Sequence, residues 1–175
     1  GYEAEQHDRP TTELPRVQEA LALAVLDAAR NASVPAAVVL VHGGALSIER
    51  IKDRADAILD AHYPGAVTGA DAVVDTLYGN SNPSGKLTYS VMPAAFTNLS
   101  DFASMDMTAA PGRGYRYYPT SPDLPPVLWP FGFGLSYTTF SMECHAGAAA
   151  TPSASAGVAV LCSLRNTGAR HGAEV

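Results

Sequence analysis

Three carboxylates, one imidazole and one guanidinium fall within residues 3–9, which read Glu-Ala-Glu-Gln-His-Asp-Arg. A carboxyl group with another carboxylate nearby has a raised pKa and can act as a general acid near neutral pH. We expect this polar segment to be a loop, and loops on a rigid scaffold commonly carry active-site groups. Spacing alone favours the simpler interpretation of a solvated charged loop, in which Asp8 and Arg9 could pair.

A second polar point is His42, which follows a short apolar run and precedes Gly43 and Gly44. Such a turn could offer backbone N–H groups to a ligand at the carboxyl edge of a sheet, but a purely structural turn is the simpler interpretation. Neither G-x-G-x-x-G nor G-K-[ST] occurs, which excludes the usual nucleotide motifs. The five histidines show no H-x-x-x-H spacing and the cysteines no C-x-x-C spacing, so we expect no metal site and no cofactor.

Aromatic residues interleave with Arg and Gly in two segments, 111–118 and 129–140. Rings beside an arginine can stack on sugars, whereas rings alternating with glycine are typical of a tightly packed corner. The corner is the interpretation that the pattern favours.

The elements that must position these residues alternate in type. Apolar residues at three- and four-residue spacing, Val17, Leu21, Ala24, Val25 and Ala28, predict the first helix. The short runs rich in β-branched residues are typical of strands covered on both faces. We predict helices over 16–30, 47–54 (with Ser47 as N-cap) and 68–78 (with Gly79 after it), and strands over 36–42, 57–61 and 86–91. Alternating helices and strands indicate an α/β fold with a parallel sheet.

Composition limits the classes of function. Hydrophobic residues make up 47% and charged residues 16%, which suffices for a globular core. A net charge of −6 argues against nucleic acid as a partner, and no apolar run approaches the roughly 20 residues of a membrane span. Residues 147–157 resemble a linker, and 158–164 a strand of an all-β module that begins near Ser136. Both ends look like cuts. Cys144 and Cys162 could form one disulfide or stay free, and both alternatives are open.

Taken together, these segments resemble the C-terminal part of glycoside hydrolase family 3, in order and over nearly the whole chain. The motifs that carry the resemblance are Glu-Ala-Glu-x-x-Asp-Arg at 3–9, Val-Leu-Val-His-Gly-Gly at 39–44, Tyr-Pro-Gly at 63–65, Asn-Pro-Ser-Gly-Lys-Leu at 82–87, Pro-Gly-Arg-Gly-Tyr-Arg-Tyr at 111–117 and Pro-Phe-Gly-Phe-Gly-Leu-Ser-Tyr-Thr-Thr-Phe at 130–140.

This resemblance implies an architecture. Residues 1–135 would form the family's three-layer α/β/α sandwich domain with a mostly parallel sheet, and 136–175 the beginning of a fibronectin type III-like domain, both truncated. We expect a secreted, extracellular or cell-wall location.

The resemblance also implies a chemistry, retaining hydrolysis of terminal β-linked sugars from glycosides and oligosaccharides. The motif places the general acid/base at Glu5, with Glu3 as the second choice, and possible substrate contacts at Glu3, His7, Asp8 and Arg9. The nucleophilic Asp would lie on a TIM-like barrel absent from these residues, so we expect the chain alone to be inactive.

The Glu-Ala-Glu form of the motif is similar to the β-xylosidase branch, with β-glucosidase as the next choice. Two other functions stay open at this point. One is a non-catalytic, carbohydrate-binding or structural member of the same family. The other is a free-standing flavodoxin-like nucleotide-binding domain, which would need a phosphate loop.

Overall fold

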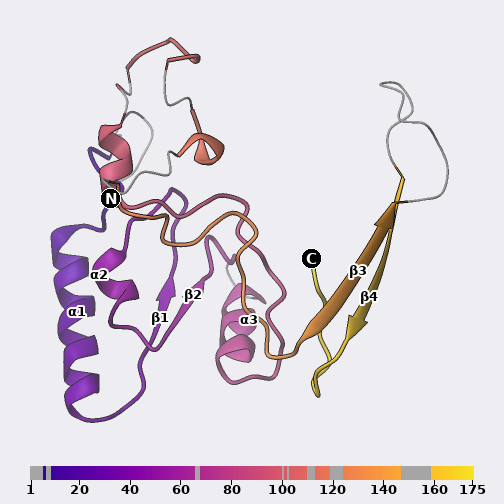
Figure 1. Ribbon diagram of the computed structural model, residues 1–175. Coiled ribbons are helices and arrows are strands. Elements are labelled where there is room, and N and C mark those ends of the chain that lie inside the picture. The colour runs from indigo at the N-terminus through magenta and orange to yellow at the C-terminus, as the bar shows by residue number, and fades with distance from the viewer. Residues whose placement is uncertain are drawn as a thin grey trace. The chain divides into compact units, whose positions relative to one another are not determined.

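The computed structural model describes residues 6, 9–65, 68–99, 101, 103–109, 113–118, 124–146 and 159–175 (Figure 1). The chain divides into two compact units: unit 1 comprises residues 1–73 and 87–133, and unit 2 comprises 74–86 and 134–175. The elements are α1 (Arg16–Asn31), β1 (Ala37–Leu40), α2 (Glu49–Lys52), β2 (Ala57–Asp60), α3 (Thr68–Leu77), the 3-10 helices η1 (Ala94–Asn98) and η2 (Tyr115–Tyr117), β3 (Phe140–Ala146) and β4 (Val160–Asn166). No helix among the described residues is long and apolar enough to cross a membrane.

Unit 1 contains a parallel pair of strands. β1 and β2 are in register from Ala37 opposite Ala57 to Leu40 opposite Asp60. Helices α1 and α2 lie beside this pair (Figure 1), and their side chains share with it a core of six buried residues, Leu23, Leu26, Leu40, Leu46, Ile48 and Ile51. The predicted α/β fold with a parallel sheet, followed by a small β segment, is confirmed.

The predicted first helix is confirmed, but the face that it buries differs from the apolar series in the sequence. Val17, Leu21 and Val25 are 77%, 65% and 55% exposed, whereas Leu23 and Leu26 are buried. At 100° per residue the two sets lie on roughly opposite sides of the helix. The spacing of apolar residues therefore predicted the helix correctly, but the face that is buried is the one that carries Leu23 and Leu26.

The structure corrects two further local predictions. Residues 86–91 form no strand. Val91 makes only an isolated bridge to Trp129, since Pro130 of the facing segment has no N–H to donate and Gly132 turns the chain with φ of 79°. Ser47 is not a helix N-cap either, because α2 begins at Glu49 and the Ser47 hydroxyl instead bonds to the carbonyl of Met92.

The third predicted helix is confirmed as α3, which ends at Leu77. Gly79 follows with φ of 76°, the left-handed conformation that commonly ends a helix and that glycine adopts without steric cost.

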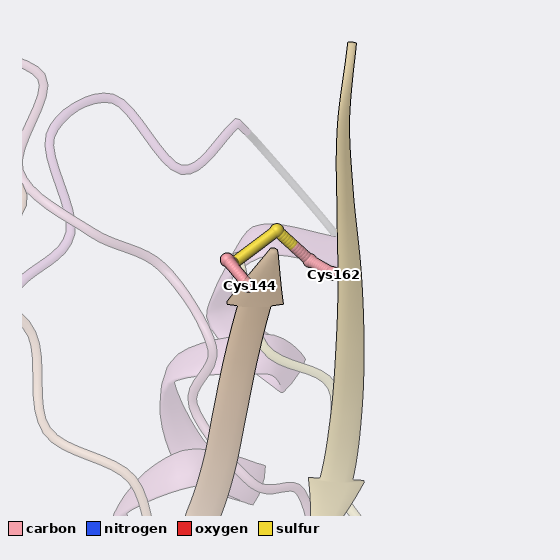
Figure 2. Close-up of a disulfide and its surroundings, with 2 residues drawn as sticks. All are labelled: Cys144 and Cys162. Carbon is pink, nitrogen blue, oxygen red and sulfur yellow. A yellow bond between two sulfur atoms is a disulfide. The ribbon is translucent and has the colours of Figure 1, made fainter. Parts of the chain in front are cut away.

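Unit 2 contains an antiparallel ribbon. β3 and β4 pair from Phe140 opposite Asn166 to Ala146 opposite Val160, and every residue of β4 is exposed. Cys144 lies opposite Cys162, and the two form a disulfide across the strands (Figure 2). Of the two alternatives that the sequence left open, the disulfide is therefore the one observed. The boundary between domains that we expect at residues 135 and 136 stays a prediction.

Candidate functional site

The carboxyl ends of β1 and β2 carry the most concentrated polar chemistry among the described residues. After β1 the chain continues into His42, and after β2 into His62. The backbone N–H of His42 donates to the carbonyl oxygen of His62 at 3.2 Å, so the two segments stay paired beyond the strands. In parallel α/β sheets this edge is where ligands commonly bind.

His42, Asp60 and His62 form a cluster at this edge. The His42 side chain is only 8% exposed, and its Nε2 atom lies 2.9 Å from Asp60 Oδ1. Its Nδ1 atom lies 2.6 Å from the carbonyl oxygen of Gly44, which can only accept, so Nδ1 must carry the proton. His62 Nε2 lies 3.6 Å from the same Asp60 oxygen, and the two imidazole centroids are 4.7 Å apart.

Two tyrosines border the cluster. The ring of Tyr89 meets that of His62 edge-on, with centroids 5.9 Å apart. Burial, and then the negative charge of Asp60, raise the pKa of the Tyr89 phenol above its ordinary value of 10.0. The Tyr63 ring packs on Gly43, where a Cβ would lie 2.5 Å from it, so a larger residue would make this exposed ring shift. Aromatic rings thus wall the polar edge.

Arg9 bonds to the segment that follows β1. Its Nη2 atom donates to the carbonyl oxygen of Ala45 at 2.8 Å, in the segment that follows β1. Further along, Ser47 N donates to Thr12 O at 2.9 Å, and the hydroxyls of Thr12 and Ser47 are 2.7 Å apart. Residues 9–13 are therefore held alongside residues 45–47. The other predicted site residues, Glu3, Glu5, His7 and Asp8, lie outside the described residues.

The aromatic segments pack on themselves and on unit 1. Tyr115 stacks on Phe131 with ring centroids 5.1 Å apart and planes 8° apart, and Lys52 Nζ lies 5.2 Å from the centre of the Trp129 ring. Arg113 donates to backbone carbonyls, including that of Ser104 at 3.0 Å. Tyr117 and Phe131 nevertheless stay 57% and 53% exposed, so the packed corner that the sequence favoured stays a prediction.

Spacing along the chain did not reveal the histidine–aspartate cluster. Its members come from two separate strand ends and form no local motif. The available signal was topological, because polar residues that directly follow two neighbouring parallel strands must meet at one edge.

Comparison with known proteins supplies a family. The sequence profile described as the glycosyl hydrolase family 3 C-terminal domain matches residues 2–137. Beta-D-xylosidase 1 of Arabidopsis thaliana is 40% identical over 146 residues, which cover 81% of this chain and 18% of that protein. The xylan 1,4-beta-xylosidase of Xylanibacter ruminicola is 35% identical over 167 residues, which cover 95% of this chain and 17% of that protein.

Solved structures agree with this assignment. A β-glucosidase from Erythrobacter marinus superimposes with a TM-score of 0.73 at 34% identity, covering 95% of this chain and 20% of that one. A GH3 exo-beta-xylosidase, solved with a xylobiose aziridine probe, gives a TM-score of 0.66 at 28% identity, covering 81% and 18%. The chain thus spans about a fifth of the length of these relatives.

Proposed function

Since the chain belongs to the glycosyl hydrolase family 3 C-terminal domain family, we propose that it contributes the general acid/base to a retaining β-glycosidase. The catalytic nucleophile, an Asp, would come from a barrel domain outside these 175 residues. The similarity of the chain to only about a fifth of each relative supports this division.

The proposed general acid is Glu5, and Glu3 is the second choice. The observation that supports this assignment is the hydrogen bond from Arg9, the last residue of the same motif, to the carbonyl oxygen of Ala45 in the segment that follows β1. In a retaining enzyme the acid and the nucleophile lie about 5–5.5 Å apart, and the acid protonates the departing glycosidic oxygen.

The proposed substrates are terminal β-D-xylosides. The relatives named as β-xylosidases from Arabidopsis thaliana and Xylanibacter ruminicola support this choice. A β-glucosidase is the second candidate, supported by the structure from Erythrobacter marinus and by the probable beta-glucosidase J of Neosartorya fischeri, 35% identical over 184 residues. Relative kcat/KM values on aryl β-xylosides and aryl β-glucosides distinguish the two.

The disulfide supports a secreted location as part of the proposal. Disulfides persist in oxidising compartments and are rare in reducing ones. Fractionation of the producing cells, with the enzyme assayed in medium and lysate, tests this point.

Glu5→Gln in the full-length enzyme tests the central assignment. Removal of a general acid costs about 10²–10⁴-fold in turnover of substrates with poor leaving groups, such as methyl β-xyloside. A dinitrophenyl leaving group needs little protonation, so its release should be nearly unaffected. The matched control is Glu3→Gln, two residues away. A large loss for Glu3→Gln alone would move the role to Glu3, and full activity of both variants would show that neither residue is the acid. Absence of turnover by the unaltered full-length protein would favour the non-catalytic alternative.

A further inference from the structure

We propose that His42, Asp60 and His62 form a binding site for a divalent transition-metal ion, best suited to Zn²⁺, at the carboxyl edge of β1 and β2. One nitrogen or oxygen atom from each residue lies within 4.8 Å of the others. The site uses none of residues 3–9, so it stands or falls independently of the proposed glycosidase activity.

The donor atoms, all within 4.8 Å of one another, have to move to hold a small ion, the most widely separated pair by up to about an ångström. A tetrahedral zinc with bonds of about 2.0–2.2 Å holds its ligand atoms about 3.3–3.6 Å apart. His62 Nε2 and Asp60 Oδ1 are already 3.6 Å apart. His42 Nε2 lies 2.9 Å from the same oxygen, and this pair has to open by about half an ångström to admit the ion.

The surroundings of His42 prepare it as a ligand. Its Nδ1–H donates to the Gly44 carbonyl, which fixes the ring and leaves Nε2 directed at Asp60. Metal-binding histidines typically donate their other ring nitrogen to a backbone carbonyl or carboxylate in this way. With its side chain only 8% exposed, His42 has little freedom to turn away.

A hydrogen bond and an uncommon backbone conformation fix Asp60 and His62, the other two proposed ligands. The backbone N–H of His62 donates to Asp60 Oδ1 at 3.3 Å, which orients the carboxylate. His62 itself has φ of 48°, an uncommon conformation for a residue other than glycine, and its side chain is 47% exposed. The half-exposed imidazole gives an ion a path from solvent and leaves a fourth position for water.

The donor set selects the type of ion. Two imidazoles and one carboxylate suit Zn²⁺ and its neighbours in the first transition row. Mg²⁺ and Ca²⁺ prefer six or more oxygen ligands, which this cluster does not provide. An imidazole nitrogen must be unprotonated to bind a metal ion, so the affinity should fall as pH falls.

Isothermal titration calorimetry of the 175-residue chain with Zn²⁺ tests the proposal. We expect binding of one ion at neutral pH, at least about tenfold weaker binding near pH 5.5, and no binding of Mg²⁺. Asp60→Asn and His62→Ala should each lower the affinity at least about tenfold. His62→Ala alters a half-exposed side chain and should fold normally, which circular dichroism checks.

The control variant is His171→Ala, which removes an exposed histidine in unit 2 and should leave the affinity unchanged. Failure of the native chain to bind Zn²⁺, or equal binding by the native chain and His62→Ala, would overturn the proposal. In that case the cluster acts only as a hydrogen-bonded join between two strand ends.

Discussion

The edge of the parallel sheet and the β3–β4 ribbon are stabilised in different ways. Unit 1 contains six buried apolar residues, and the polar side chains at its sheet edge bond to one another, as His42 and Asp60 do. The ribbon in unit 2 exposes every residue of β4 and is joined by a disulfide. The polar cluster at the sheet edge, which needs a fixed geometry, therefore lies in the unit that contains the apolar core. The ribbon instead exposes the residues of β4.

Polar bonds link the described residues of unit 2. Asn82 accepts from the backbone N–H of Tyr137 at 2.6 Å and donates to the Ser136 hydroxyl at 3.0 Å. Lys86 pairs with Glu174 at 3.1 Å, with side chains 16% and 19% exposed. Two of the motifs that carry the family resemblance thus meet here in a structural role rather than in catalysis.

The largest expected effect comes from the difference in core packing between the two regions. Ile51 is 1% exposed, and Ile51→Ala should lower the free energy of unfolding of unit 1 by about 2–5 kcal/mol, because it leaves a cavity. Leu161 on β4 is 75% exposed, and Leu161→Ala should cost about 0.5 kcal/mol or less. Urea unfolding followed by the fluorescence of Trp129 for unit 1, and by hydrogen exchange of the β4 amides for unit 2, measures both. Equal effects would contradict the contrast.

The next effect concerns the disulfide. Replacing both Cys144 and Cys162 with Ser frees the unfolded ribbon from a cross-link between residues 18 apart, which should destabilise unit 2 by about 3 kcal/mol on the chain-entropy account. Hydrogen exchange should accelerate in β3 and β4 and stay unchanged in β1 and β2. Comparable acceleration in both sheets would show that the ribbon supports unit 1, contrary to the contrast drawn above.

The smallest expected effect concerns how stability depends on pH through Tyr89, at the carboxyl edge of β1 and β2. Because the folded state raises the pKa of Tyr89 above its ordinary value of 10.0, the unfolded chain loses that proton first as pH rises. The contribution of Tyr89 to stability is therefore complete below about pH 10 and declines as pH rises through the folded pKa. Tyr89→Phe should reduce the decline of the urea midpoint with rising pH. Tyr78→Phe, which changes an 81% exposed ring, should leave that decline unchanged. An unchanged slope in Tyr89→Phe would argue against a buried phenol.

Local pattern predicted the elements that local forces determine. The helices over 16–30 and 68–78 and the first two strands follow from periodicity and from the glycine at position 79. The strand expected over 86–91 failed because its pairing depends on Pro130 and Gly132, some forty residues away. The pairing of Cys144 with Cys162 could not be decided before the register of β3 and β4 was known.

At the candidate site, too, contacts between residues distant in the sequence could not be predicted from local pattern. Arg9 was predicted as a possible substrate contact; the structure shows its bond to the carbonyl oxygen of Ala45, and its role stays a prediction. The cluster of His42, Asp60 and His62 was missed, because only the parallel pairing of two strands brings these residues together. The assignments of Glu3, Glu5, His7 and Asp8 stay predictions that rest on the family motif.

The pH dependence of kcat/KM for Glu5→Gln in the full-length enzyme tests the central claim most directly. A retaining glycosidase needs a protonated acid and an ionised nucleophile, which gives the unaltered enzyme a bell-shaped profile. If Glu5 is the acid, the variant should lose the alkaline limb and keep the acidic one. A variant profile that keeps both limbs would contradict the role of Glu5.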